Sequence, residues 1–191
     1  MNASSDQHRG PRTGPAGAAA RRFHDVREAA AAVLTGVVAL YIALVAFGNV
    51  TDFDTNREFV RHVLAMDTTF RDGDVMWRAV TSRAWQDAAY VVAIVVWESA
   101  AALVLIAATG LWLRRGVRHR ARSLSTAGLL MLLVLFGAGF IALGGEWFAM
   151  WQSEKWNGLE AATRVVLLSG LTLLTVHTTP DRPGAPGGGT D

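Results

Sequence analysis

The sequence predicts an all-α, multi-pass membrane protein: four transmembrane helices with a short amphipathic interfacial helix in the first external loop. Three observations support this fold class. Of the 191 residues, 51% are hydrophobic and only 18% are charged, so apolar residues must be concentrated in segments. Several segments without charge are long enough to cross a hydrocarbon core of roughly 30 Å at about 1.5 Å per residue. Arginine clusters flank these segments, as topology signals do.

The predicted transmembrane domain covers residues 28–179, with spans at about 29–51, 88–113, 123–145 and 160–179. Residues 1–27 and 180–191 are expected to be disordered cytoplasmic tails, because their Gly, Pro, Ser and Ala-rich composition cannot bury much apolar surface. The first span could alternatively be a signal peptide, since Arg21, Arg22 and Arg27 precede it. Its apolar run exceeds a typical signal-peptide core, so we interpret it as an anchor.

The first loop, residues 52–87, carries arginines and acidic residues in balance. An excess of positive charge therefore does not hold this loop on the cytoplasmic side of the membrane. Phe59, Val60, Val63 and Leu64 recur at helical spacing with polar residues on the other face. This pattern predicts a short helix lying on the bilayer surface. Asp72-Gly73-Asp74 could begin a calcium loop, but the other ligands at that spacing are missing, so we expect a plain turn.

The second span contains one charge, Glu98, and is followed by five arginines between Arg114 and Arg122 with no acid among them. This cluster predicts that the loop after the second span is cytoplasmic, with both termini on the same side and residues 52–87 and 145–160 outside. Glycines in the third span permit close helix approach. The fourth span is free of charge only over residues 165–180. It is long enough to cross the membrane if the Arg164 side chain extends and places its guanidinium group at the outer surface.

The loop between the third and fourth spans holds three tryptophans within ten residues. Tryptophan combines an apolar ring with one N–H group and is therefore stable at headgroup depth. We expect an interfacial platform, with Glu146 either hydrogen-bonded to its loop or paired with Arg164. Its predicted members are Trp77, Trp85, Glu146, Trp147, Trp151, Trp156 and Arg164.

Several motifs resemble those of a known family. They are Met66-Asp-Thr-Thr-Phe70, the segment Met76-Trp-Arg-Ala-Val-Thr-Ser82, and Gly144-Gly-Glu-Trp-Phe-Ala-Met-Trp-Gln-Ser153 followed by Trp156-Asn-Gly158. They are similar to the bacterial proteins described as "predicted small integral membrane protein", a domain of unknown function. The resemblance covers roughly residues 29–176 and implies a four-helix membrane protein. It brings no established activity.

Glu98 is the one candidate polar site inside the predicted spans. Ten residues separate it from the start of its span, about 15 Å, which places it near the bilayer midplane. A charge there costs about 2.5 to 3.5 kcal/mol, so the carboxyl should be neutral, hydrogen-bonded or facing water. The partners expected at that depth are Tyr41, Ser169 and Thr172. The site is either a structural tie between helices or a proton or cation site.

Little catalytic chemistry is available. The chain has no cysteine, which excludes disulfides, thiolate metal sites and cysteine nucleophiles. His62 and His177 are predicted on opposite sides of the membrane, so they cannot clamp one haem. A metal site from His62, Asp67, Asp72, Asp74, Glu146 or Glu154 lacks tight ligand spacing. We predict no enzyme activity, no cofactor, no metal and no nucleic-acid partner.

The functional hypothesis is a non-catalytic accessory or assembly subunit of a complex in the bacterial cytoplasmic (inner) membrane. Its predicted partners are the lipid bilayer and other membrane proteins, which contact the tryptophan-rich external surface. The alternative is a proton- or small-solute-handling protein that uses Glu98.

The predicted topology can be tested with reporter fusions. Fusions after residues 60 and 155 should report an external location, and fusions after residues 118 and 185 a cytoplasmic one, because arginine clusters hold their loops inside. An external signal at residue 118 would contradict the prediction.

Overall fold

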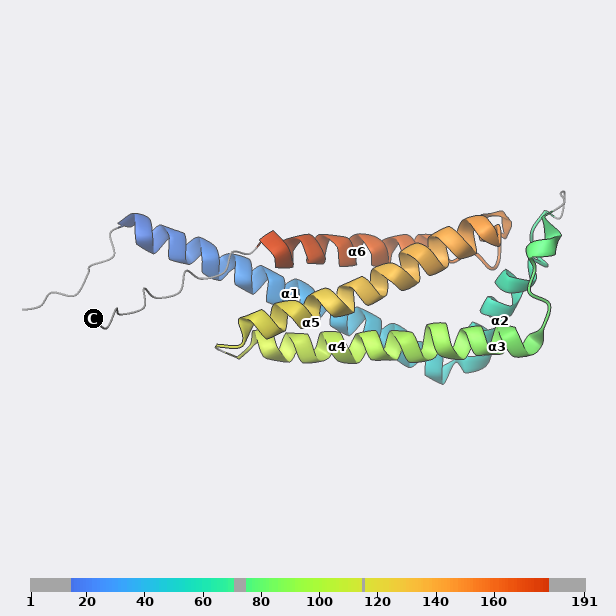
Figure 1. Cartoon of the computed structure of the whole chain (residues 1–191), viewed down its shortest axis with the longest axis horizontal. Helices are drawn as coiled ribbons and strands as arrows, with labels where there is room; N and C mark the ends of the chain where they lie inside the picture. The colour runs from blue at the N-terminus through green and yellow to red at the C-terminus, as the bar shows by residue number, and fades with distance from the viewer. Residues whose placement is uncertain (1–14, 71–74, 115, 179–191) are drawn as a thin grey trace, which may run out of the picture.

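The structure is a computed structural model that describes residues 15–70, 75–114 and 116–178. It confirms the predicted all-α class with four candidate membrane spans: the regular elements of the described residues are helices, with no strand among them. Four helices are long and apolar enough to cross a membrane, and they run side by side along the molecule (Figure 1). They cover Asp25–Thr51, Arg83–Trp112, Arg118–Trp147 and Leu159–Thr178.

Two of the four spans change helix type along their length. The second span joins α3 to a π-helical segment and then α4, and the third joins α5 to a longer π-helical segment. π-helical turns are uncommon and occur often at functional sites. The elements in chain order are α1 (Pro15–Thr51), α2 (Phe53–Ala65), the 3-10 turn η1 (Met76–Arg78), α3 (Arg83–Ala89), the π-helix η2 (Tyr90–Val96), α4 (Trp97–Trp112), α5 (Arg118–Leu132), the π-helix η3 (Leu133–Trp147), the 3-10 turn η4 (Met150–Gln152) and α6 (Leu159–Thr178).

The first helix is longer than the sequence predicted. Helix α1 begins at Pro15, so residues 15–27, which we expected in a disordered tail, continue the helix. Proline is favourable at a first helical position, and the alanines that follow have the highest helix propensity. Residues 1–14 and 179–191, with most of the predicted tails, and the expected turn at 72–74 lie outside the described residues.

The core of the bundle is built on close packing of small residues. Helix α4 packs on α1 and on α5, while α6 packs on α5 and η3. Ala101, Ala102 and Ala108 of α4 are buried. On α5, Gly128 is so close to α4 that an added Cβ would lie 2.6 Å from Leu105 Cγ. Small residues allow such approaches, which supply the van der Waals contacts that hold helices together in lipid.

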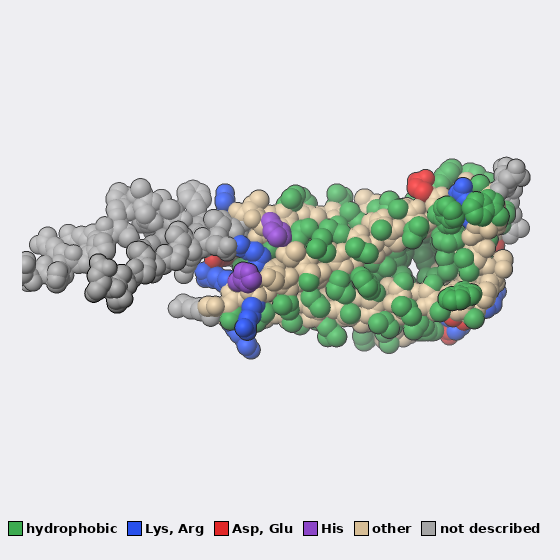
Figure 2. All heavy atoms as spheres, viewed as in Figure 1, with side chains coloured by type: hydrophobic (Ala, Val, Ile, Leu, Met, Phe, Trp, Pro, Cys, Tyr) green, Lys and Arg blue, Asp and Glu red, His purple; other side chains and the backbone are tan. Residues whose placement is uncertain are grey.

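One end of the bundle is held by polar contacts, and we call it the arginine end. Trp112 Nε1 donates to Ser125 Oγ at 3.0 Å, and Thr35 Oγ1 lies 3.4 Å from the same atom. These contacts join α4, α1 and α5 at one level. Beyond them Arg118 pairs with Glu28 at 2.6 Å. Figure 2 shows blue arginine and purple histidine side chains gathered at this end, with mostly apolar side chains along the bundle.

The opposite end carries what we call the cap: residues 53–70, 75–82 and 148–158. Thr68 Oγ1 donates to Ser153 Oγ at 2.9 Å, and the Phe70 N–H donates to Gln152 Oε1 at 3.0 Å. The two loops of the cap are therefore joined directly. The cap is also tied to the second span, because Arg61 binds both carboxylate oxygens of Asp87 at 2.8 and 2.9 Å.

Helix α2 forms where the amphipathic pattern predicted a helix, but its apolar side faces the bundle. Phe59, Val60, Val63 and Leu64 line a pocket together with residues of η2 and η3. The expectation was that these four side chains would lie in lipid. The cap instead uses them to cover the end of the bundle, which the sequence pattern alone cannot distinguish, because both environments are apolar.

Gly128 provides a direct test of the packing between α4 and α5. Gly128→Ala should lower the free energy of unfolding by about 1 to 3 kcal/mol, because the new methyl group overlaps Leu105, which is fully buried. The matched control is Gly170→Ala in α6, where nothing lies within 4 Å of an added Cβ. The control should be neutral or stabilising by up to about 1 kcal/mol. Unfolding in mixed micelles measures both, and equal effects would contradict the packing.

Candidate functional site at the junction of bundle and cap

A buried polar cluster lies where the bundle meets the cap. Asn49 Nδ2 donates to Glu98 Oε2 at 2.5 Å, and the Tyr90 hydroxyl donates to the Asn49 carbonyl oxygen at 2.6 Å. All three side chains are buried, with 8% of Asn49, 1% of Glu98 and none of Tyr90 exposed. The cluster therefore exchanges hydrogen bonds internally, which is the condition for burying polar groups in an apolar environment.

Three different elements supply these residues. Asn49 lies two residues before the end of α1, Tyr90 is the first residue of η2, and Glu98 is the second residue of α4. The Phe53 ring packs edge-on against Tyr90 with ring centroids 4.9 Å apart. Phe53 is the first residue of α2. The cluster thus joins the first span, the second span and the start of the cap.

The partners expected for Glu98 are elsewhere. Tyr41 is half-buried against the hydrophobic core. Thr172 is buried, and its hydroxyl donates to the Leu168 carbonyl oxygen of its own helix at 2.7 Å. Ser169 is fully buried, and its hydroxyl has no hydrogen-bond partner among the described residues. Asn49 replaces all three as the partner of Glu98.

The reason is the relative height of the two helices: Glu98 of α4 lies level with Asn49, close to the end of α1. Trp112 of α4 and Thr35 of α1 are at one level, because both contact Ser125. Glu98 and Asn49 each lie fourteen residues from that level along their helices, about 21 Å. Tyr41 is only six residues from Thr35, about 9 Å. Counting depth on the separate helices therefore placed Tyr41 level with Glu98, whereas the packing of α1 on α4 places Asn49 there.

Asn49 could have been found from the sequence. It is the only carboxamide in the apolar run 29–51, as Glu98 is the only charge in the second run. Isolated polar residues on neighbouring spans tend to hydrogen-bond each other, because lipid offers no other partner. The pairing was missed because the height of each residue was counted along its own helix, without knowing how the helices are shifted against each other.

The geometry suits a tie between helices better than a relay. Among the described residues, the hydrogen-bond partner of the Glu98 carboxyl is a neutral amide. The described chain also holds no group of three or more histidine or acidic residues that could bind a metal ion. A proton relay needs a chain of titratable groups, and in this cluster the Tyr90 hydroxyl donates to the Asn49 carbonyl oxygen and not to Glu98.

The predicted platform separates into aromatic clusters in the cap and at the adjoining end of η3. Trp77 and Trp147 meet edge to face with centroids 5.6 Å apart, and the Arg78 guanidinium lies 4.8 Å from the Trp147 ring. Trp156 stacks on His62 with centroids 4.7 Å apart. Trp151 contacts Phe70 edge-on at 6.0 Å. The structure brings the two loops together through these rings, while their depth in a membrane stays a prediction.

The remaining platform residues behave differently from the expectation. Arg164 pairs with Glu160 at 3.1 Å on its own helix, and not with Glu146. Glu146 is exposed. Pairs at this spacing form readily on a helix surface, because side chains four residues apart lie on one face. Trp85 is 72% exposed on α3.

Variants of Glu98 test the structural tie. Glu98→Ala should lower the free energy of unfolding by about 0.6 to 1.7 kcal/mol, the range for hydrogen bonds between membrane helices. Glu98→Gln retains an acceptor for the Asn49 amide and should remain close to wild type. In a double-mutant cycle, Asn49→Ala should add little once Glu98 is alanine. Additive losses, or a Gln variant as unstable as the Ala variant, would contradict the tie.

Comparison with known proteins supports the fold. Residues 27–179 match the family described as "Predicted small integral membrane protein (DUF2165)". No curated protein and no solved structure matches the chain. The matched region runs from the arginine end of α1 to the end of α6 and contains all four spans, the cap and the Asn49–Glu98 cluster. The chain belongs to this family of small integral membrane proteins.

Proposed function

We propose that this protein is a non-catalytic accessory or assembly subunit of a membrane complex, and that the cap binds the partner protein. The observation that carries the proposal is the set of large aromatic side chains left exposed on the cap. Trp77 is 70% exposed, Trp151 is 51% exposed and Phe70 is 60% exposed, and Trp85 of α3 lies next to them in the chain. Exposed tryptophans beside an arginine are typical of energetically important interface residues.

Orientation determines which partner surface can reach the cap. Five arginines between Arg114 and Arg122, with no acid among them, lie in the chain at the opposite end of the bundle from the cap, which favours a cytoplasmic location for both termini and an external location for the cap. The proposed compartment is the bacterial cytoplasmic membrane. A partner would then be a membrane protein with a surface on the external side. The contacts among Trp77, Arg78 and Trp147 support binding, because side chains that already pack against one another lose less entropy when they bind.

The proposal is tested by native electrophoresis of the full-length chain extracted in mild detergent from its own membranes. The wild type should migrate in a complex with a second, different chain in fixed stoichiometry. Trp77→Ala with Trp85→Ala should release it as a free subunit, because both rings are largely exposed before binding.

The matched control replaces two equally exposed apolar residues on the sides of the spans, Leu103→Ala with Leu171→Ala, which are 67% and 62% exposed. This control should leave the complex intact. A wild type that migrates alone or only with copies of itself, or a complex that survives loss of both tryptophans, would contradict the proposal.

A second candidate function is proton or small-cation handling at Glu98. The observation that favours it is the burial of a single carboxyl group inside a span with only 1% exposed. Flux measured in proteoliposomes separates the candidates. The accessory function predicts no pH-dependent flux above that of protein-free vesicles. Wild-type flux that Glu98→Gln abolishes in a folded protein would support the second candidate instead.

A further inference from the structure

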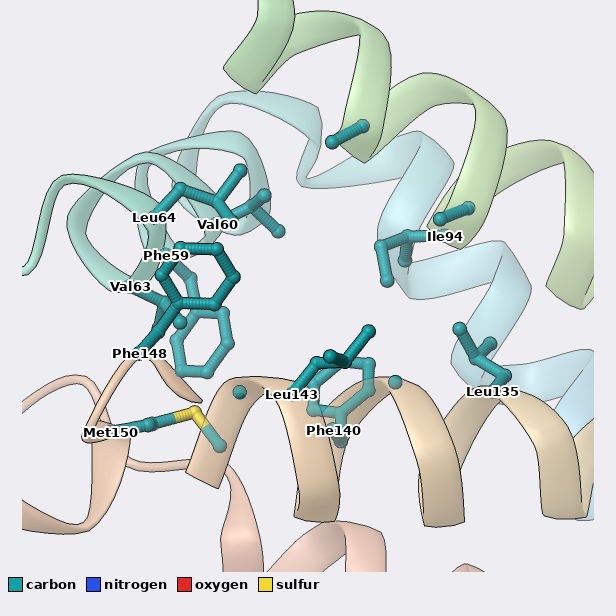
Figure 3. Close-up of a pocket in the computed structure, with 14 residues that line it drawn as sticks. Phe59, Val60, Val63, Leu64, Ile94, Leu135, Phe140, Leu143, Phe148 and Met150 are labelled. Atoms are coloured by element: carbon teal, nitrogen blue, oxygen red, sulfur yellow. The ribbon is translucent and has the colours of Figure 1, made fainter. Parts of the chain in front are cut away.

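An apolar pocket lies beneath α2, where the cap meets the bundle. It has a volume of about 160 Å³. Figure 3 shows Phe59, Val60, Val63 and Leu64 of α2 on one side, Ile94 of η2 on another, and Phe140 and Leu143 of η3 below them. Phe148 and Met150 close the side toward the cap. No charged side chain lines the pocket.

Both long walls of this pocket are π-helical. Helix η2 contributes Ala93 and Ile94, and η3 contributes Leu135, Gly139, Phe140, Leu143 and Gly144. Small residues stand where larger side chains would fill the space: Ala89, Ala93 and Gly139 all line it. An added Cβ at Gly139 would meet only ordinary contacts, the nearest at 3.6 Å. Backbone geometry and side-chain size together therefore keep this volume open.

The pocket opens on the side of the bundle. Ala93 and Leu143 line it and are both exposed, one on each π-helical wall. Figure 2 shows the side of the molecule hollowed near the cap between the helices that supply these residues. The material next to the side of a membrane-spanning bundle is lipid. An apolar void loses its dispersion contacts unless something fills it, and lipid chains are the apolar groups at hand.

A cation contacts the end of η3, the helix that forms one wall of the opening. Trp147 follows Leu143 by four residues, about one helical turn, and the Arg78 guanidinium lies 4.8 Å from the Trp147 ring. Arg78 Nε is buried without a hydrogen-bond partner among the described residues, and no carboxylate of the described chain forms an ion pair with Arg78. Only Nε of this guanidinium is buried, and a phosphate group can bind its terminal N–H groups.

We propose that the pocket beneath α2 is a binding site for one phospholipid, with part of an acyl chain between η2, η3 and α2 and the phosphate at Arg78. Apolar cavities of about 150 Å³ bind molecules as large as benzene, so the pocket has room for a segment of about six carbons. Transfer of a chain from bilayer to pocket removes no apolar surface from water. Selectivity therefore depends on packing in the pocket and on the contact with Arg78.

The test reconstitutes the full chain in vesicles of phosphatidylglycerol and phosphatidylcholine that contain a phosphatidylglycerol with a photoreactive group in one acyl chain. After illumination, peptide mass spectrometry measures labelling of the pocket residues Val63, Phe140 and Leu143. Leu171, which is 62% exposed on α6, serves as the internal reference for ordinary lipid contact. Pocket labelling should exceed labelling at Leu171 several-fold.

Filling the pocket should remove this excess. Ala93→Leu places a larger side chain in the opening, and its control is Ala107→Leu at an exposed alanine of α4 that does not line the pocket. Leu143→Phe is a second blocking variant at an exposed position, so the test does not depend on one variant folding. Blocking variants should reduce pocket labelling to the level at Leu171, and Ala107→Leu should not change it.

Arg78→Gln tests the phosphate contact, with the exposed Arg83→Gln as its control. Arg78→Gln should lower pocket labelling several-fold while labelling at Leu171 stays constant. Equal labelling of the pocket and Leu171 in the wild type, or pocket labelling that the blocking variants leave unchanged, would overturn the site. Unchanged labelling in Arg78→Gln would overturn the assignment of the phosphate to this arginine.

Discussion

The buried contact between Asn49 and Glu98 constrains the position of the whole cap. Asn49 lies four residues before Phe53, where α2 begins, so fixing Asn49 against α4 fixes the point from which α2 leaves the bundle. Tyr90 strengthens the constraint by binding the Asn49 backbone. In lipid, an unpaired carboxyl or amide is costly, so the two groups hold α1 and α4 in one register. The ion pair between Arg61 and Asp87 then holds the other end of α2 on α3.

The placement of α2 has consequences for both surfaces of the cap. On the side toward the bundle, α2 covers the ends of η2 and η3 without filling the space between them, which leaves the apolar pocket. Elsewhere in the cap, the two loops meet through Thr68 and Ser153, and the pair Trp77–Trp147 joins the first loop to the end of η3. The arginine end is held together by different groups. There the side chains of a tryptophan and a threonine both contact one serine hydroxyl, whereas the contact near the cap joins an amide to a carboxyl group.

The long uncharged runs predicted the four spans because length and hydropathy suffice to identify membrane helices. Helix α6 begins and ends within one residue of its predicted limits. Glu98 was also identifiable, since a lone charge in an apolar run is conspicuous. Asn49 was equally conspicuous as the lone carboxamide of its run, but its pairing with Glu98 was missed, because relative heights depend on how α1 and α4 pack. The direction of the apolar face of α2 was likewise hidden, since lipid and the bundle end are both apolar. The π-helical walls have no signature in hydrophobic periodicity.

One measurement tests whether the Asn49–Glu98 contact positions the cap. The chain contains no cysteine, so Thr68→Cys with Ser153→Cys introduces a single pair, whose parent hydroxyl oxygens are 2.9 Å apart and within reach of a disulfide. Oxidation rates are compared in three backgrounds: wild type, Glu98→Gln and Glu98→Ala. The account predicts rapid cross-linking in wild type and Glu98→Gln and slower cross-linking in Glu98→Ala, because only the alanine variant frees the end of α1. Equal rates in all three backgrounds would contradict it.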